Sequence, residues 1–195
     1  MMKMFVRSLV LGASLLLAAT AVSAGGIHYQ VDTSTRFMAD EAANLSGFRM
    51  TWTYEPEVSA VIIDGRNMDS GELRQLGEDI MEDLYGLGYY IQFTVNDRPV
   101  PFNKVTHFGI KLVENQRIQM EMQVDLKKAI PVAGTVLRLK LVDPDGSAVL
   151  VYSGAEKVVL ANDLVSKCAG ATLENQMMQL NGHDMDVQTA SVVCQ

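Results

Sequence analysis

Apolar and polar residues alternate through most of the chain, and this alternation predicts β-strands. In the segment 48–54, aromatic or apolar residues take every second position, and arginine or threonine fills the others. The segments 106–112 and 118–126 alternate in the same way on either side of Glu114-Asn115. These two segments predict a long antiparallel hairpin with one buried and one solvated face.

The alternation continues toward the C-terminus. It is found in the segments 136–142, 148–153 and 157–161. Asp143-Pro144-Asp145-Gly146 has the composition of a tight turn. The pattern of 173–186 leaves its structure open, and we expect 187–194 to form a last edge strand.

One region has helical instead of strand periodicity. Pro56 suits the first turn of a helix, although the segment 57–63 fits two helical turns or a strand. Asp69 stands three residues before Glu72, which is similar to a capping box. Between residues 73 and 87 the apolar residues recur at helical spacing, and glycines follow as stop signals.

Strands therefore dominate, with a helical insertion at about 56–88. The fold class that we expect is α+β and mostly β, namely an antiparallel β-sandwich-like domain with a short α-helical insertion after the first strands. Residues 25–195 have the length of a single domain. A chain of this length buries an adequate core without metals or several disulfides.

The N-terminal residues 1–24 have the three parts of a secretory signal peptide. Lys3 and Arg7 give a basic start, residues 9–22 are apolar, and Val22-Ser23-Ala24 places small residues at the cleavage site. The apolar run is shorter than the roughly 20 residues that span a bilayer. We therefore expect an exported, β-rich mature domain that is not embedded in a membrane.

The charge of the chain excludes one class of partner. Its net charge is −7 at pH 7, and removal of Lys3 and Arg7 with the signal makes the mature chain more negative. Its only basic doublet is Lys127-Lys128. A nucleic acid repels such a surface, so we expect no nucleic-acid binding.

The chain has two cysteines, Cys168 and Cys194. An exported protein meets an oxidising compartment, which favours a disulfide between them. The bridge would close a loop of about 25 residues and stabilise the fold by roughly 3 kcal/mol. A metal or redox pair is the alternative interpretation.

Several short motifs, in their order along the chain, resemble one exported bacterial family. They are Ile27-His28-Tyr29, Met50-Thr51-Trp52-Thr53-Tyr54-Glu55, Asp69-Ser70-Gly71-Glu72-Leu73, Val95-Asn96-Asp97-Arg98-Pro99-Val100 and Val142-Asp143-Pro144. The sequence resembles the family known as domain of unknown function 1007. Its members are often labelled the periplasmic component of an uncharacterised ABC-type transport system, and many lie beside nickel, cobalt or zinc transport genes.

The resemblance implies a periplasmic location and a partnership with an inner-membrane metal transporter. It also implies that the cofactor, if one is bound, is a divalent transition metal. The chain departs from the family at two places. Family members commonly begin with His-Pro-His, of which only His28 is present here. Many members also have a loop that looks like a calcium site. Here residues 64–69 replace it, and Arg66 and Met68 stand at positions where a hard cation needs oxygen ligands.

The candidate metal ligands are few. His28 lies near the mature N-terminus, and cleavage after Gly25 would make Gly26-Ile27-His28 an amine-terminal chelate for copper or nickel. His183 and Met185 follow a turn near the C-terminus and form a second candidate set, because thioethers suit cuprous copper. The alternative is that these residues serve strand edges and packing.

No motif for catalysis is present in the sequence: there is no nucleophile elbow, no His-Glu-x-x-His helix and no phosphate-binding glycine loop. We therefore expect no enzyme. Tyr85, Tyr89 and Tyr90 mark either a docking patch or helix packing. Two functions remain: a non-enzymatic periplasmic accessory or substrate-binding-like component of a nickel, cobalt or zinc transport system, or a ligand-free structural or protein-interaction domain of the cell envelope.

Overall fold

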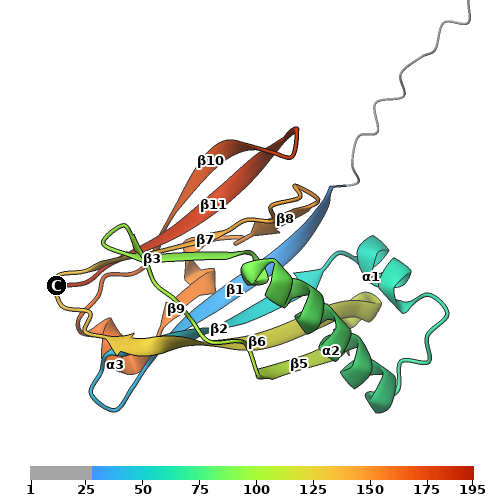
Figure 1. Ribbon diagram of the computed structural model, residues 1–195, viewed down its shortest axis with the longest axis horizontal. Helices are drawn as coiled ribbons and strands as arrows, with labels where there is room; N and C mark the ends of the chain where they lie inside the picture. The colour runs from blue at the N-terminus through green and yellow to red at the C-terminus, as the bar shows by residue number, and fades with distance from the viewer. Residues whose placement is uncertain (1–27) are drawn as a thin grey trace, which may run out of the picture.

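The computed structural model describes residues 28–195, so the predicted signal peptide and Gly25 to Ile27 lie outside the described residues. The strands form two separate sheets (Figure 1). The first sheet has six strands: β5 (His107–Val113), β6 (Arg117–Ile130), β2 (Leu45–Tyr54), β1 (Tyr29–Ala39) and β8 (Ala148–Val151), with β9 (Val158–Leu160) also beside β1.

The second sheet has five strands. They are, in order, β10 (Thr172–Leu180), β11 (His183–Val193), β7 (Val136–Leu141), β3 (Ile91–Val95) and β4 (Arg98–Pro99). Together with the helices, these sheets confirm the mostly β, α+β fold class that the alternation predicts. The predicted long hairpin is also confirmed, since β5 pairs antiparallel with β6 from His107 to Val113.

One part of the pairing differs from the expected antiparallel arrangement. β1 pairs in parallel with β8 and with β9, whereas the other strand pairs are antiparallel. β7 lies in the second sheet, and the chain crosses from it back to the first sheet at the turn before β8. The crossing brings β8 alongside β1 in the same direction.

The inner faces of the two sheets pack on one another through aromatic side chains. Phe37 of β1 and Phe48 of β2 have ring centroids 6.0 Å apart, and Phe93 of β3 lies 6.1 and 5.4 Å from them. All three side chains are buried. Burial of a phenylalanine side chain stabilises a fold by about 1.5–3 kcal/mol, so this cluster joins the two sheets into a sandwich.

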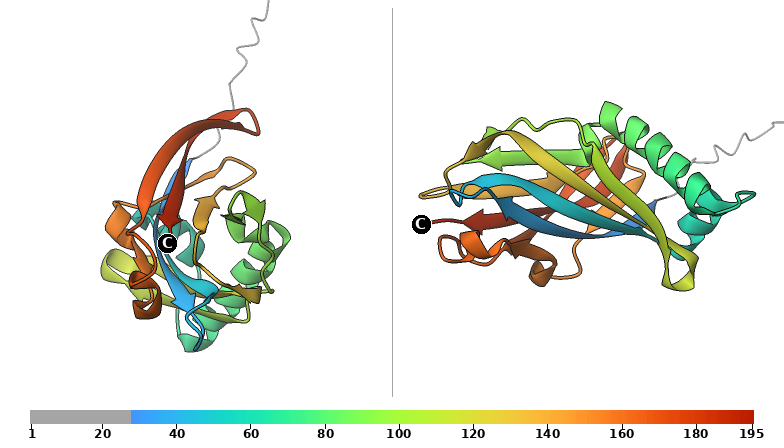
Figure 2. Two further views of the ribbon diagram at one scale, coloured as in Figure 1. Left: turned by 90° about the vertical axis from the view of Figure 1, so that its left-hand side faces the viewer. Right: turned by 90° about the horizontal axis from the view of Figure 1, so that it is seen from below.

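The insertion between β2 and β3 is helical. α1 (Pro56–Ile63) carries proline in its first turn, so the helical alternative for 57–63 is the right one. α2 (Ser70–Gly86) begins at Asp69, whose Oδ1 accepts hydrogen bonds from two backbone N–H groups of its first turn at 2.9 and 3.0 Å. Both helices lie toward the end of the sandwich opposite the C-terminus (Figure 2).

Gly77 lets α2 approach the sheet closely. A Cβ atom at this position would lie 3.1 Å from side-chain atoms of both Phe108 and Ile110 on β5. Within residues 28–195, no helix is long and apolar enough to cross a membrane.

The C-terminal segment differs from its prediction. β11 is not an edge strand, because it lies between β10 and β7. The segment 173–186, which the pattern left open, forms most of the β10–β11 hairpin, and β10 takes the edge. The side chains of β10 are mostly exposed and polar, so they carry little of the alternation that reveals a half-buried strand.

Two further predictions concern cysteine and tyrosine. The sulfur atoms of Cys168 and Cys194 lie 2.06 Å apart, which is bonding distance, so these residues form the predicted disulfide.

Tyr89 is buried and Tyr90 stacks on Trp52 with 6.0 Å between ring centroids. Tyr85 is half-exposed beneath the Lys104 ammonium group. Packing therefore explains Tyr89 and Tyr90.

Candidate functional site

The candidate site lies where β1 begins, at the end of the sandwich that also carries the tip of the β10–β11 hairpin (Figure 1). The hairpin turns at Asn181-Gly182, and both residues have positive φ values, 46° and 85°. Asparagine and glycine are the residues that adopt this conformation most readily, and they are typical of a two-residue hairpin turn. The turn places His183 as the first residue of β11.

The parallel pairing of β1 with β8 positions the other side of the site. Tyr29 is opposite Ala148, and its backbone N–H donates a 3.0 Å hydrogen bond to the carbonyl oxygen of Ser147. The first residue of β1 is thereby attached to the turn between β7 and β8. His28 precedes this anchored residue directly.

The buried Asp143 side chain stabilises the β7–β8 turn through hydrogen bonds to the backbone of the turn. Its side chain is buried, and its carboxylate accepts hydrogen bonds from the backbone N–H groups of Asp145, Ser147 and Ala148 at 2.8–3.0 Å. These three bonds compensate for the burial of the charge. The buried carboxylate therefore holds the turn against which β1 begins.

Gly146 brings the hairpin tip onto this turn. It has a φ of +69°, and a Cβ atom there would lie 2.9 Å from the carbonyl oxygen of Leu180 and 3.6 Å from the Cβ of His183. A larger residue would therefore separate the turn from the hairpin. The close approach carries His183 to the beginning of β1.

The result is a pair of imidazole rings from residues that are far apart in sequence. The ring centroids of His28 and His183 are 4.9 Å apart, and the ring planes cross at 80°. His28 is exposed and His183 is partly buried, so solvent reaches the pair. Two of the three residues that the sequence predicts as metal ligands thus lie side by side.

The third predicted ligand, Met185, lies elsewhere. Its side chain is buried and packs with Val142 and Val187, as the packing alternative requires. His107 is exposed on β5 and is within 3.2 Å of the hydroxyl of Thr106. Among residues 28–195, no group of three or more histidine, cysteine, aspartate and glutamate side chains is arranged to hold a metal ion.

Burial and, to a smaller extent, carboxylates raise the pKa values of two tyrosines, Tyr29, which follows His28 directly, and Tyr90. Burial raises the pKa of Tyr29, and the charge of Asp143 raises it further. The pKa of Tyr90 is raised by burial and then by the charges of Asp143 and other neighbours, including Asp145. The charge of Asp143 thus acts on both tyrosines, and the charge of Asp145 also acts on Tyr90.

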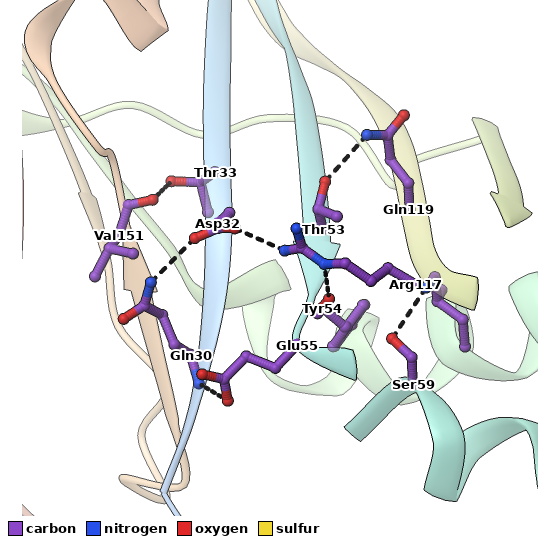
Figure 3. Close-up of polar contacts among 11 residues, drawn as sticks. Gln30, Asp32, Thr33, Thr53, Tyr54, Glu55, Ser59, Arg117, Gln119 and Val151 are labelled. Atoms are coloured by element: carbon purple, nitrogen blue, oxygen red, sulfur yellow. Dashed lines mark hydrogen bonds and ion pairs between the residues drawn. The ribbon is translucent and has the colours of Figure 1, made fainter. Parts of the chain in front are cut away.

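A polar network holds the same end of the first sheet together (Figure 3). Arg117 of β6 donates from Nε to the carbonyl oxygen of Tyr54 at 2.8 Å and from a terminal nitrogen to Asp32 of β1 at 2.6 Å. The backbone N–H of Gln30 donates to the Glu55 carboxylate at 3.0 Å. These bonds fix β1, β2 and β6 where the chain leaves β2 for α1.

The sequence pattern did not reveal this network. Arg117 and Asp32 are 85 positions apart. Each lies on the polar face of its strand, and the alternation predicts only that such side chains are exposed to solvent. The hydrogen bond from Arg117 is the largest of the influences that lower the pKa of Asp32. No signal within either segment indicates this partner.

The model of a family described as "Protein of unknown function (DUF1007)" matches residues 10–179. No curated protein matches the chain.

Proposed function

The chain belongs to the DUF1007 family, and we propose that it is a non-enzymatic periplasmic accessory component of a nickel, cobalt or zinc transport system. In this role it binds the metal ion through His28 and His183. The observation that carries the proposal is the 4.9 Å separation of the two imidazole centroids at a solvent-accessible end of the fold.

The chemistry of the pair suits a transition metal. Neutral imidazole is the commonest protein ligand for such ions, and it suits zinc and nickel. One nitrogen from each ring, at the usual metal–nitrogen distance of about 2.0–2.1 Å, brings the rings about as close as these two. The carboxylate of Asp143, whose charge contributes to the raised pKa of the neighbouring Tyr29, adds attraction for a dication.

Two protein ligands suit a carrier better than a permanent metal centre. Structural zinc sites are closed by four protein ligands, whereas a two-histidine site leaves positions for water or for a ligand group of the transporter. An ion held in this way exchanges readily. Such exchange is what an accessory protein that delivers or collects an ion requires.

The mature N-terminus gives a competing geometry for the same ion. If the signal is cleaved after Gly25, the amine of Gly26, two backbone nitrogens and the imidazole of His28 form a square-planar set for nickel or copper. This chelate does not use His183. The role of His183 therefore distinguishes the two geometries.

Calorimetric titration of the purified protein with nickel, cobalt, zinc and copper tests the proposal. We expect His28→Ala and His183→Ala each to weaken binding at least about tenfold, which corresponds to about 1.4 kcal/mol. His107→Ala is the matched control, because His107 is exposed on β5, and it should leave affinity unchanged. Mass spectrometry of the exported protein gives the cleavage site.

Each outcome has a definite meaning. Loss of binding in His28→Ala but not in His183→Ala supports the amine chelate and rejects the imidazole pair. If no metal binds with a Kd below about 100 µM, or about −5.5 kcal/mol, the carrier role is rejected. The chain is then better described as a ligand-free interaction domain of the envelope.

A further inference from the structure

A hollow lies between the helical insertion and the end of the first sheet. It has a volume of about 580 Å³, which is within the usual range of small-molecule sites. α1 lines it with Val58 and Ile62, and α2 lines it with Leu76 and Ile80. The helices thus supply an apolar wall, and neither histidine of the candidate metal pair is part of it.

The opposite wall is made of tyrosine. Tyr29, Tyr54 and Tyr90 all line the hollow, and the rings of Tyr29 and Tyr54 are stacked with centroids 6.4 Å apart. Tyr90 stacks on Trp52 behind it. The faces of electron-rich rings attract cations, and this attraction is strongest where water is excluded.

The hydroxyl of Tyr54 lacks a partner in the described part of the chain. Tyr54 is only 7% exposed, and neither its pKa nor that of Tyr90 is influenced by a hydrogen bond. Nε1 of Trp52 is the buried side-chain polar atom without a partner in residues 28–195, so the Tyr54 hydroxyl oxygen itself still reaches solvent and can bond to water. An oxygen or nitrogen atom of a ligand in the hollow would replace that water at the Tyr54 hydroxyl.

The mouth of the hollow carries an excess of negative charge. Asp64, Asp79 and Asp83 line it, together with one cation, Arg66. All four are exposed, and in residues 28–195 none of them takes part in an ion pair. A positively charged ligand would gain from these carboxylates, and an anion would be repelled.

We propose that this hollow binds a small organic cation, an ammonium group on an apolar body. The apolar part lies against α1 and α2, the charged part faces the tyrosine rings and the aspartates, and a polar atom of the ligand meets the Tyr54 hydroxyl. The direction in which the pKa values of Tyr29 and Tyr90 move supports this polarity, because both are raised in part by negative charges.

Three probes of one shape separate charge from size. Choline is the cation, 3,3-dimethylbutan-1-ol is its uncharged counterpart, and 3,3-dimethylbutanoate carries the opposite charge. Trp52 is the only tryptophan of the chain and stacks on Tyr90, so its fluorescence reports on the tyrosine wall. Titrations of the purified protein contain EDTA, so that metal at the histidine pair does not contribute.

We expect choline to bind at least about tenfold tighter than the alcohol, or about 1.4 kcal/mol, and the anion to bind more weakly than both. Asp79→Asn with Asp83→Asn should weaken choline at least about threefold, or about 0.7 kcal/mol, and leave the alcohol unchanged. Glu78→Gln is the control, because Glu78 is an exposed residue of the same helix that does not line the hollow. Tyr54→Phe should weaken choline without changing the melting temperature by more than a few degrees.

The proposal is overturned if choline and the alcohol bind equally, or if the anion binds as tightly as choline. It is also overturned if choline gives no saturable signal up to about 50 mM, a free energy weaker than about −2 kcal/mol. An equal loss of choline binding in Glu78→Gln and in the aspartate double variant would show a general charge effect and would reject the site.

Discussion

The disulfide between Cys168 and Cys194 should be a main source of the stability of the C-terminal half. The two cysteines are separated by 26 positions, and the loop between them contains the whole β10–β11 hairpin. β10 pairs with β11 and lies at the edge of its sheet. Without the bridge, this segment is held by the pairing of β11 with β7 and by non-covalent contacts, among them backbone hydrogen bonds beside the two cysteines.

The magnitude follows from the length of the loop. The chain-entropy relation gives about 3.5 kcal/mol for closing a loop of this size in the unfolded chain. For a domain of this length, each kcal/mol shifts the melting temperature by about 2–4 °C. Loss of the bridge should therefore lower the melting temperature by about 7–14 °C.

Two samples measure this loss in different ways. Thermal unfolding by circular dichroism compares the oxidised protein with the same protein under reducing agent and with the double variant Cys168→Ala, Cys194→Ala. The reduced protein keeps both sulfur atoms, so it isolates the cross-link from the change in side-chain volume. Urea unfolding should also show a larger m-value after reduction, because the unfolded chain exposes more surface.

The backbone at the bridge helps to keep the native fold in the reduced protein. The N–H of Cys194 donates to the carbonyl oxygen of Thr135 at 2.8 Å, and the N–H of Ala169 donates to that of Val193 at 2.8 Å. The spectrum at low temperature should therefore stay unchanged. A melting temperature that falls by less than about 3 °C, or under about 1 kcal/mol, would refute the entropic explanation.

Two substitutions test the contacts that hold the insertion. Arg117→Met removes the bonds to Tyr54 and Asp32 and should lower the free energy of unfolding by about 1–2 kcal/mol in urea titrations at pH 7. Because Arg117 lowers the pKa of Asp32 in the folded state, the ionised Asp32 carboxylate contributes stability above its unfolded pKa of about 3.9. The difference in stability between variant and wild type should therefore narrow as the pH falls below about 4, whereas a constant difference would contradict the ion pair. Asp69→Ala removes the N-cap of α2 and should lower the same free energy by about 1 kcal/mol, while Asp69→Asn, which keeps an acceptor oxygen, should restore most of it; equal losses in both variants would contradict the capping role.

Patterning predicted the strands because one face of each is buried. In β6 the inward residues Ile118 to Leu126 are buried at every second position, and the polar residues between them are partly exposed. The same principle failed at β10, where five of nine residues are polar amides, acids or threonine and six are exposed. An edge strand that buries little apolar surface leaves little periodic signal in its sequence.

The partners of the strands were harder to predict than the strands themselves. Local hairpins such as β5–β6 follow from their short connection, but β1 and β8 are separated by most of the chain. Their parallel pairing depends on where the chain crosses between sheets. Neither segment records that crossing in its own composition.

The candidate sites illustrate the same limit at the level of side chains. The sequence singled out His28 for its place near the N-terminus and His183 for its place after a turn, but it gave no reason to bring the two together. In the sequence, Tyr54 ended a predicted strand, Tyr90 followed the predicted helix, and Tyr29 stood only in a family motif. Each residue type was visible in the sequence, whereas the juxtaposition belongs to the fold.

Both sites depend on one feature of that fold, the start of β1. His28 and Tyr29 are consecutive, yet His28 faces His183 and Tyr29 lines the tyrosine wall. The hydrogen bond from the Tyr29 N–H to Ser147 and the parallel register that follows it fix the backbone between the two side chains. The buried Asp143 carboxylate holds the turn that provides this anchor. The Asp143 carboxylate, which belongs to neither site, therefore positions both the imidazole pair and one wall of the hollow.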